Sequence, residues 1–337
     1  MDTSLRSPFD DSLATSGEPL AVTGLGHVIC PADAPPCDPT PYLRQRKLRK
    51  FMGAQDDLAV VAAGATLASA ELSGRPLGER VGLYIVVGYI PFEEKHLSGI
   101  VTASTENGSF SMARFSVDGL EATNPIHAFR CLPNMPAFHV SVSFDIQGPY
   151  LVTYPGPAQL YLALESAALA LETGTIDCAL VGGVAHQQNL LVQHHYGRIA
   201  HPMAPARLAD AAAFFVLERE ETAAARRAPR HGRLLSWSVD YRRHDPFHEA
   251  FSPCETFEMP RRGATACPSA DDSQNDSQND CTSFNAPPPL SASIVPEGLG
   301  PASLPAYLSM AVGRTPLLEH SLCSRDGITA SSRWEVA

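Results

Sequence analysis

Apolar and polar positions along residues 20–240 follow patterns that favour both strands and helices. Arg80–Ile90 is a continuous apolar run rich in Val and Ile, typical of a strand covered on both faces. Asp56–Glu71 is Ala-rich with acidic residues in its first turn, which predicts a helix. Gln159–Thr173 is apolar on most sides, which predicts a helix inside the protein. Strands that alternate with helices imply an α/β fold whose sheet carries helices on both faces.

Further strands are expected at Leu20–Thr23, Phe138–Ile146, Asp177–Val181, Ala211–Glu218 and Arg233–Asp240. In Phe138–Ile146 every second residue is apolar, which predicts a half-buried strand or one edge of a partner interface. Gly24-Leu25-Gly26 and Gly182-Gly183 follow two of these strands and are interpreted as turns. The first is no dinucleotide-binding fingerprint, because Ile29 stands where the third glycine would be.

The composition divides the chain into four segments. Residues 1–19 form a flexible tail, and residues 20–240 hold the α/β pattern. Residues 241–290 are expected to be a strand remnant followed by a disordered linker, because 251–290 contains a tandem DSQN repeat and a proline run. Residues 291–337 regain apolar content and form a shortened final segment.

Charge and targeting patterns exclude several functional classes. With 25 basic and 36 acidic residues the formal net charge is −11, which argues against nucleic acid and against an anionic membrane surface. No secretory leader and no membrane-spanning apolar run is visible, so a cytoplasmic protein is expected. None of the eight cysteines forms a CxxC pair, and reduced thiols are expected.

Two groups of histidines raise the question of a metal site. His186, His194, His195 and His201 lie close in sequence, but no Cys, Asp or Glu lies among them, so solvated histidines are favoured over a metal site. His244 and His248 have helical ligand spacing, but Pro246 prevents a regular helix. We expect no metal and no cofactor.

The segment Gly148–Ala185 resembles the nucleophile region of β-ketoacyl synthases of the thiolase fold. The resemblance rests on the Gly148-Pro149 pair, Gly174, Asp177, the Ala179-Leu180 pair and Gly182-Gly183, all in frame without a gap. Segments near residues 21–26, 80–84 and 210–218 resemble other strands of that family in the same order. The resemblance implies a thiolase-like layered α/β fold with a complete N-terminal half and a shortened C-terminal half.

One departure from the family decides the expected function. Counting back from Gly174, the position of the family's nucleophilic cysteine falls on Pro157. Proline has neither a nucleophile nor a backbone N–H for an oxyanion, although it fits the first turn of a helix. The two histidine motifs of the family's second half are also absent; one histidine position falls near Glu297.

A thiolase-fold chain without the cysteine is similar to the chain length factors that pair with an active ketosynthase. The resemblance implies a non-catalytic subunit that helps to shape an acyl tunnel, with an active ketosynthase and also an acyl carrier protein as partners. The residues placed near that tunnel are Tyr154, Pro157, Gln159, Met135 and Phe138. The strand Phe138–Ile146 would contact the ketosynthase.

Alternatives to this reading remain open. An active acyltransferase of the same fold could use Ser143 or Cys131, although the sequence offers no convincing base. An eroded relative without a role is a third reading. Cys178 is expected to pack in the core. The basic run Arg44–Lys50 is either a docking face for an acidic carrier protein or a solvated helix face.

Overall fold

The computed structural model describes residues 18–31, 34–92, 94–198, 208–241, 254–258, 296–324 and 327–337. The sequence predictions for the first 17 residues, the DSQN repeats, His201, His244 and His248 lie outside these ranges.

The fold alternates strands and helices over most of its length. The strands are β1 (Leu20–Cys30), β2 (Val81–Val87), β3 (Thr105–Glu106), β4 (Ser109–Phe110), β5 (Tyr150–Thr153), β6 (Cys178–Ala185), β7 (Asp210–Arg219), β8 (Gly232–Tyr241), β9 (Cys254–Glu258), β10 (Leu317–Cys323) and β11 (Ile328–Val336). The α-helices are α1 (Ala54–Ser69), α2 (Glu94–Ala103), α3 (Met112–Arg114), α4 (Pro125–Arg130), α5 (Met135–Phe144), α6 (Gln159–Glu172), α7 (Leu190–Arg198), α8 (Glu220–Ala225) and α9 (Ser303–Ala311). Tighter or wider helical turns form η1 (Thr40–Tyr42), η2 (Arg46–Phe51), η3 (Phe115–Gly119) and η5 (Pro296–Ala302).

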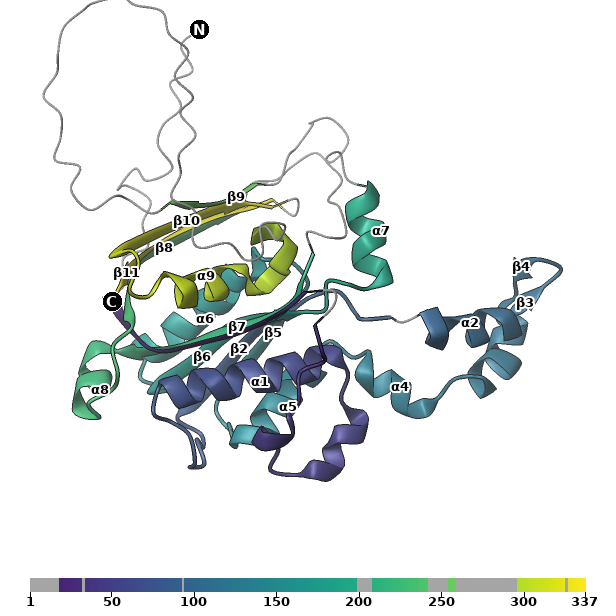
Figure 1. Ribbon diagram of the computed structural model, residues 1–337, viewed down its shortest axis with the longest axis horizontal. Helices are drawn as coiled ribbons and strands as arrows, with labels where there is room; N and C mark the ends of the chain where they lie inside the picture. Colours follow the sequence, from purple (N-terminus) through teal and green to yellow (C-terminus); the bar gives the residue numbers. More distant parts are fainter. Residues whose placement is uncertain are drawn as a thin grey trace, which may run out of the picture.

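Nine strands form one sheet in the order β5-β2-β6-β7-β1-β8-β11-β10-β9. β1 joins its two parts, because it pairs with β7 along its length and with β8 through Leu20–Val22. Figure 1 shows the consequence: the sheet folds over so that α6 and α9 lie between its two parts, while α1 and α5 cover the outer face of the N-terminal part. The layered α/β fold expected from the sequence is confirmed.

The central helices lie in the largest apolar cluster. α6 contributes Leu160, Leu164 and Leu171, and α9 contributes Leu304 and Leu308. Strands on both sides of these helices add residues to the same cluster, so one core serves both parts of the sheet. The helices predicted near residues 56–71 and 159–173 are confirmed as α1 and α6, and the strands predicted near 80–90, 211–218 and 233–240 as β2, β7 and β8.

The strand predicted at Phe138–Ile146 is wrong, because this segment belongs to helix α5. Pro136 lies in the first turn of α5, and Asp145 ends the helix in the left-handed conformation with φ 57°. The buried side of α5 includes His139, which the strand prediction had placed on the polar face.

The turns predicted at the two glycine pairs are also wrong, because both pairs lie within strands. β1 continues through Gly24 and Gly26, and β6 continues through Gly182 and Gly183. A Cβ on Gly24 would lie 2.6 Å from the Cβ of Ala70, which follows α1. These glycines therefore permit close packing of a helix on the sheet, and no chain reversal occurs there.

The linker predicted for 251–290 is wrong in part, because its residues 254–258 form β9 and pair with β10. β10 and β11 form a hairpin after α9, and this hairpin lies between β8 and the edge strand β9. Among the described helices, none combines the length and apolar character that crossing a bilayer needs.

Candidate functional site

The parallel strands β1, β2, β5 and β6 end at the same edge of the sheet. The turn from β5 into α6 lies at this edge, which is the usual place for sites in parallel sheets. Thr153 anchors the turn, since its Oγ1 donates to the carbonyl of Gln159 at 3.3 Å. We call residues 153–159 the α6 entry turn.

The α6 entry turn leaves few donors for a ligand. The backbone N–H groups of Gln159, Leu160 and Tyr161 donate to the carbonyls of Gly156, Pro157 and Ala158, each at 3.1 Å. Pro157 itself has no N–H. The first turn of α6 therefore uses its own N–H groups internally, although a helix N-terminus often offers them to an anion.

Aromatic side chains surround the turn. The ring of Tyr154 lies 5.9 Å from that of Tyr89, and the ring of Tyr89 lies 5.3 Å from that of His195. Tyr154 is 39% exposed, and partial burial raises the pKa of its phenol. Gln55 at the start of α1 donates to the Tyr89 carbonyl at 3.0 Å, so α1 reaches the same edge.

The five residues predicted for the acyl tunnel fall into two groups. Tyr154, Pro157 and Gln159 share the α6 entry turn. Met135 and Phe138 lie in the first turns of α5, which covers the other face of the sheet (Figure 1). Met135 is buried, while Phe138 is 44% exposed.

The candidates for an alternative nucleophile lie elsewhere. Ser143 is buried within α5, and Cys131 is half-buried in the turn before that helix. Cys178 is buried as expected, and burial raises the pKa of its thiol, which disfavours the reactive thiolate.

Sequence reasoning missed a chain of buried polar groups between α6, α9 and the C-terminal strands. The Tyr161 hydroxyl lies 2.7 Å from Nδ1 of His320 and 2.7 Å from Oγ of Ser332. Nε2 of His320 lies 3.0 Å from Oε1 of Glu255, which also accepts from Ser303 at 2.5 Å. Each side chain is almost fully buried.

A single direction of donation fits this chain. Trp334 donates its indole N–H to Ser332 at 2.8 Å. Ser332 can then donate to Tyr161, Tyr161 to Nδ1 of His320, and His320 to the carboxylate of Glu255. The chain therefore ends on a buried anion that receives two hydrogen bonds on one oxygen. No motif spacing predicts it, since Tyr161 and Ser332, which bond directly, lie 171 positions apart.

A second buried polar cluster lies at the start of α1. Burial raises the pKa of Asp56 to about 8 and that of Asp57 to about 6. Arg49 donates to Asp57 at 2.8 Å, and thereby uses one charge of the basic run Arg44–Lys50 inside the fold. Burial also lowers the pKa of His139 to about 4, so the imidazole is neutral at pH 7.

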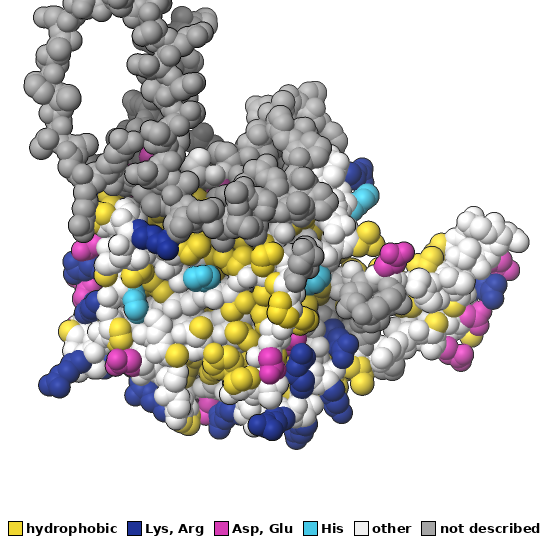
Figure 2. Space-filling model, in the orientation of Figure 1, with side chains coloured by type: hydrophobic (Ala, Val, Ile, Leu, Met, Phe, Trp, Pro, Cys, Tyr) yellow, Lys and Arg dark blue, Asp and Glu magenta, His cyan; other side chains and the backbone are white. Residues whose placement is uncertain are grey.

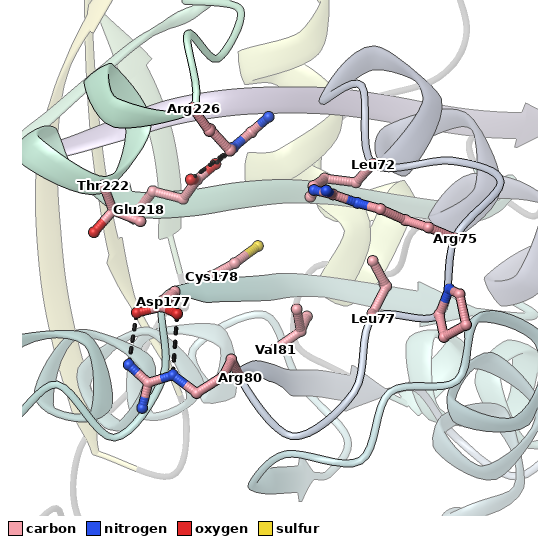
Figure 3. Close-up of a pocket in the computed structure, with 11 residues that line it drawn as sticks. Leu72, Arg75, Leu77, Arg80, Val81, Asp177, Cys178, Glu218, Thr222 and Arg226 are labelled. Atoms are coloured by element: carbon pink, nitrogen blue, oxygen red, sulfur yellow. Dashed lines mark hydrogen bonds and ion pairs between the residues drawn. The ribbon is translucent and has the colours of Figure 1, made fainter.

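A cavity of about 300 Å³ opens at the opposite edge of the sheet (Figure 3). Its walls carry two ion pairs: Arg80 holds Asp177 through two bonds of 2.6 and 3.0 Å, and Arg226 holds Glu218 at 2.5 Å. The side chains of Arg75 and Thr222 and the buried thiol of Cys178 also line this cavity.

The histidines near residue 190 make no metal site within the described ranges. His194 lies 3.3 Å from an Arg198 nitrogen, and His186 lies 3.4 Å from a carboxylate oxygen of Asp210. No group of three metal-ligating side chains gathers anywhere in the part of the chain that the structure describes.

The family follows from a comparison with known proteins. The profile of the β-ketoacyl synthase N-terminal domain matches residues 21–222 of the 337 residues. The chain belongs to the β-ketoacyl synthase family. This family membership covers β1 through the start of α8, including the α6 entry turn. Among proteins of curated function, none matches the sequence.

Two solved structures with TM-scores above 0.5 share the fold of this β-ketoacyl synthase family member, and a third shows a weaker similarity. One is described as a type II polyketide synthase acyl-carrier protein in complex with its ketosynthase bound to the hexaketide (AntDE:AntF); it has a TM-score of 0.63 and 13% identity, covering 95% of this chain and 99% of that chain. A β-ketoacyl synthase from Burkholderia phymatum STM815 has a TM-score of 0.58 and 14% identity, covering 94% and 99%. The ishigamide ketosynthase/chain length factor has a TM-score of 0.48 and 19% identity, covering 66% and 64%.

Proposed function

We propose that this chain is a non-catalytic β-ketoacyl synthase-like subunit that pairs with an active ketosynthase and helps to shape its acyl tunnel. The observation that carries the proposal is the α6 entry turn. Family resemblance puts the nucleophile at Pro157, and proline supplies neither the attacking sulfur nor an N–H for the oxyanion.

The hydrogen bonding of the turn supports the same reading. Because the N–H groups of Gln159, Leu160 and Tyr161 bond to carbonyls of the turn, they do not point to a substrate oxyanion. Loss of a single oxyanion donor costs roughly 100- to 1,000-fold in rate. A turn that lacks both a thiol and an N–H at residue 157, and that is followed by three internally bonded N–H groups, favours a non-catalytic role.

Exposed apolar side chains support pairing with another protein. Residues 94–132 form an arm of α2, the β3-β4 hairpin, α3, η3 and α4 that projects from the body (Figure 1). The arm exposes Phe110, Met112, Val117, Leu120 and Phe129 to about half or more of their surface. Figure 2 also shows apolar side chains gathered across the middle of the viewed face. Exposed apolar patches of this kind mark protein interfaces.

Co-expression with a ketosynthase encoded beside it tests the proposal. We expect the two chains to co-elute, and condensation to need the cysteine of the ketosynthase. Pro157→Ala should leave condensation by the pair unchanged, while Gln159→Ala and Phe138→Ala should alter product length. Tyr241→Ala, at an exposed residue of β8, is the matched control.

Two results would contradict the proposal. One is failure of the chains to associate at any ratio. The other is a covalent acyl adduct on the purified chain after exposure to an acyl thioester, which intact-protein mass would reveal and which Ser143→Ala or Cys131→Ala would abolish if the alternative acyltransferase reading were right.

A further inference from the structure

Two thiols lie in contact at the edge of the sheet where β1 ends. Sγ of Cys30, the last residue of β1, lies 3.4 Å from Sγ of Cys37. Both thiols are half-buried, so a small molecule can reach them. A disulfide has a sulfur separation of about 2.0 Å, so closing this gap needs only a small rotation of the side chains.

The backbone holds Cys30 in place. Cys30 pairs with Asp210 in the ladder between β1 and β7, and its carbonyl accepts from the side-chain amide of Gln188 at 3.2 Å. Cys37 packs against the apolar cluster beneath α1. The approach of the two sulfurs is therefore fixed by the fold on both sides.

The two thiols are chemically unequal. The hydrogen bond from Cys37 lowers the pKa of the Cys30 thiol, and the same bond raises the pKa of the Cys37 thiol. Since the thiolate is the nucleophile, Cys30 is suited to attack and Cys37 to act second.

We propose that Cys30 and Cys37 form a redox-active dithiol that a small-molecule disulfide oxidises to an intramolecular disulfide. The Cys30 thiolate attacks one sulfur of the small disulfide, whose S–S bond breaks and releases one thiolate. The Cys37 thiolate then attacks Cys30 in the mixed disulfide and releases the second thiolate. The two cysteines lose two electrons to the small disulfide, and their two protons end on the released thiols.

Neither Cys178 nor Cys323 fits this role. Cys178 is buried, and burial raises the pKa of its thiol. Cys323 lies 3.4 Å from the hydroxyl of Thr329. The new bond would tie Cys37, in the segment after β1, to the end of β1, where the Cys30 carbonyl accepts from Gln188. This end of β1 lies at the same edge of the sheet as the α6 entry turn.

Titration of the purified, reduced chain with glutathione disulfide tests the proposal. We expect two thiols to become resistant to alkylation, and peptide mapping without reductant to join the peptides of Cys30 and Cys37. In Cys37→Ser we expect the mixed disulfide with glutathione to accumulate on Cys30. In Cys30→Ser we expect glutathione disulfide to modify Cys37 more slowly than it modifies Cys30 in Cys37→Ser. Cys323→Ser, the matched control, should behave as the unchanged chain.

The unchanged chain keeps the test valid if a variant does not fold, because the peptide map needs no substitution. The proposal is overturned if both thiols remain alkylatable at saturating glutathione disulfide or if the map joins other cysteines. Equal glutathionylation rates in the two variants, with unchanged far-UV circular dichroism, would overturn the assignment of Cys30 as the attacking thiol.

Discussion

Tyr161 is the middle link of the buried hydrogen-bond chain that ends on Glu255. Its hydroxyl forms hydrogen bonds with His320 and Ser332, and both of these side chains are buried. The hydrogen bonds of the Tyr161 hydroxyl add little net stability themselves. Removing the hydroxyl costs more, because it leaves two buried partners without a hydrogen bond.

Tyr161→Phe should therefore destabilise the fold by roughly 1–3 kcal/mol, because buried His320 and Ser332 each lose a partner while the ring still fills its space. Urea unfolding at pH 7 measures this loss. Tyr150→Phe, at an exposed tyrosine of β5, should leave the midpoint unchanged. Equal midpoints for both variants would show that the buried chain contributes nothing.

Asp56 makes stability depend on pH in an unusual direction. Burial raises its pKa to about 8 in the fold, compared with roughly 3.9 for an unfolded Asp. Between these values the folded chain holds a proton that the unfolded chain has released, so the free energy of unfolding falls as pH rises. Asp57 adds to this fall at lower pH, since its pKa is raised to about 6.

Asp56→Asn should remove most of the fall in the free energy of unfolding with pH, because Asn stays neutral. Its side-chain oxygen can still accept the Gly53 N–H, which in the unchanged chain lies 2.7 Å from an Asp56 carboxylate oxygen. Relative to the unchanged chain, the free energy of unfolding of the variant should rise by up to about 1.4 kcal/mol per pH unit between pH 5 and 8. Unfolding curves at several pH values measure this gain. Asp38→Asn removes an exposed carboxylate whose pKa is lowered by bonds from Thr40, and should give no such gain. Parallel profiles for Asp56→Asn and the unchanged chain would refute the assignment.

At the scale of elements, the long apolar segments were predictable and the short alternating one was not. β2 is buried along its whole length, whereas α6 buries one side and exposes Glu165, Leu169 and Glu172. The apolar composition of both segments indicated their place. The period of two in Phe138–Ile146 misled because apolar residues at positions 138, 140, 142 and 144 also form i, i+4 pairs on a helix. Pro136, in the first turn of α5, and Asp145, directly after its last residue, were the better indicators of a helix.

The strand glycines mark close approaches that a sequence does not reveal. A Cβ on Gly183 in β6 would lie 2.1 Å from the Pro301 carbonyl oxygen in η5. The contact joins residues more than a hundred positions apart, so the sequence does not reveal it. The local preference of paired glycines for turns led to the wrong prediction of a turn at Gly182-Gly183.

Gly183→Ala should therefore destabilise the fold by about 1–3 kcal/mol, because β6 and η5 must separate. Gly99→Ala is the same chemical change in the middle of α2, where nothing lies within 4 Å of the added Cβ. It should raise the free energy of unfolding by about 0.5–1 kcal/mol. Urea midpoints of the two variants should move in opposite directions. A shift of Gly183→Ala in the stabilising direction would contradict the packing argument.

At the scale of the whole molecule, the C-terminal strands present two different faces. In β11 the residues Ile328, Ala330, Ser332, Trp334 and Val336 are buried toward the central helices. The alternate residues of its other face are Thr329, Ser331, Arg333 and Glu335. Pairs such as Ser238–Ser331 at 2.8 Å and Thr256–Ser321 at 2.7 Å continue this polar face across neighbouring strands. The described part of this face thus has the composition of a solvated sheet surface.

This polarity bears on whether the C-terminal segment is a working part of the fold. A sheet that has lost a covering layer without adapting would expose apolar side chains there. The outer side chains of β11 are instead hydroxyls and charges, and Ser331 and Arg333 bond to neighbouring strands. The family resemblance could place the segments in order, but only the alternation within paired strands indicates that the segment is adapted to its surroundings.

The shared core predicts that both parts of the sheet unfold together. Both tryptophans, Trp237 in β8 and Trp334 in β11, lie in the C-terminal part, and Trp334 packs on Phe215 of β7 at 5.3 Å between ring centres. Tryptophan fluorescence therefore reports on the C-terminal strands, whereas far-UV circular dichroism reports on every helix and strand. Since one apolar cluster spans both parts and β1 pairs with strands on both sides, we expect the two signals to follow a single thermal transition. Trp237→Phe, which leaves Trp334 as the sole reporter, should preserve the agreement between the two signals. A fluorescence transition that precedes loss of the circular dichroism signal would mean that the C-terminal strands unfold independently of the core they share with β7.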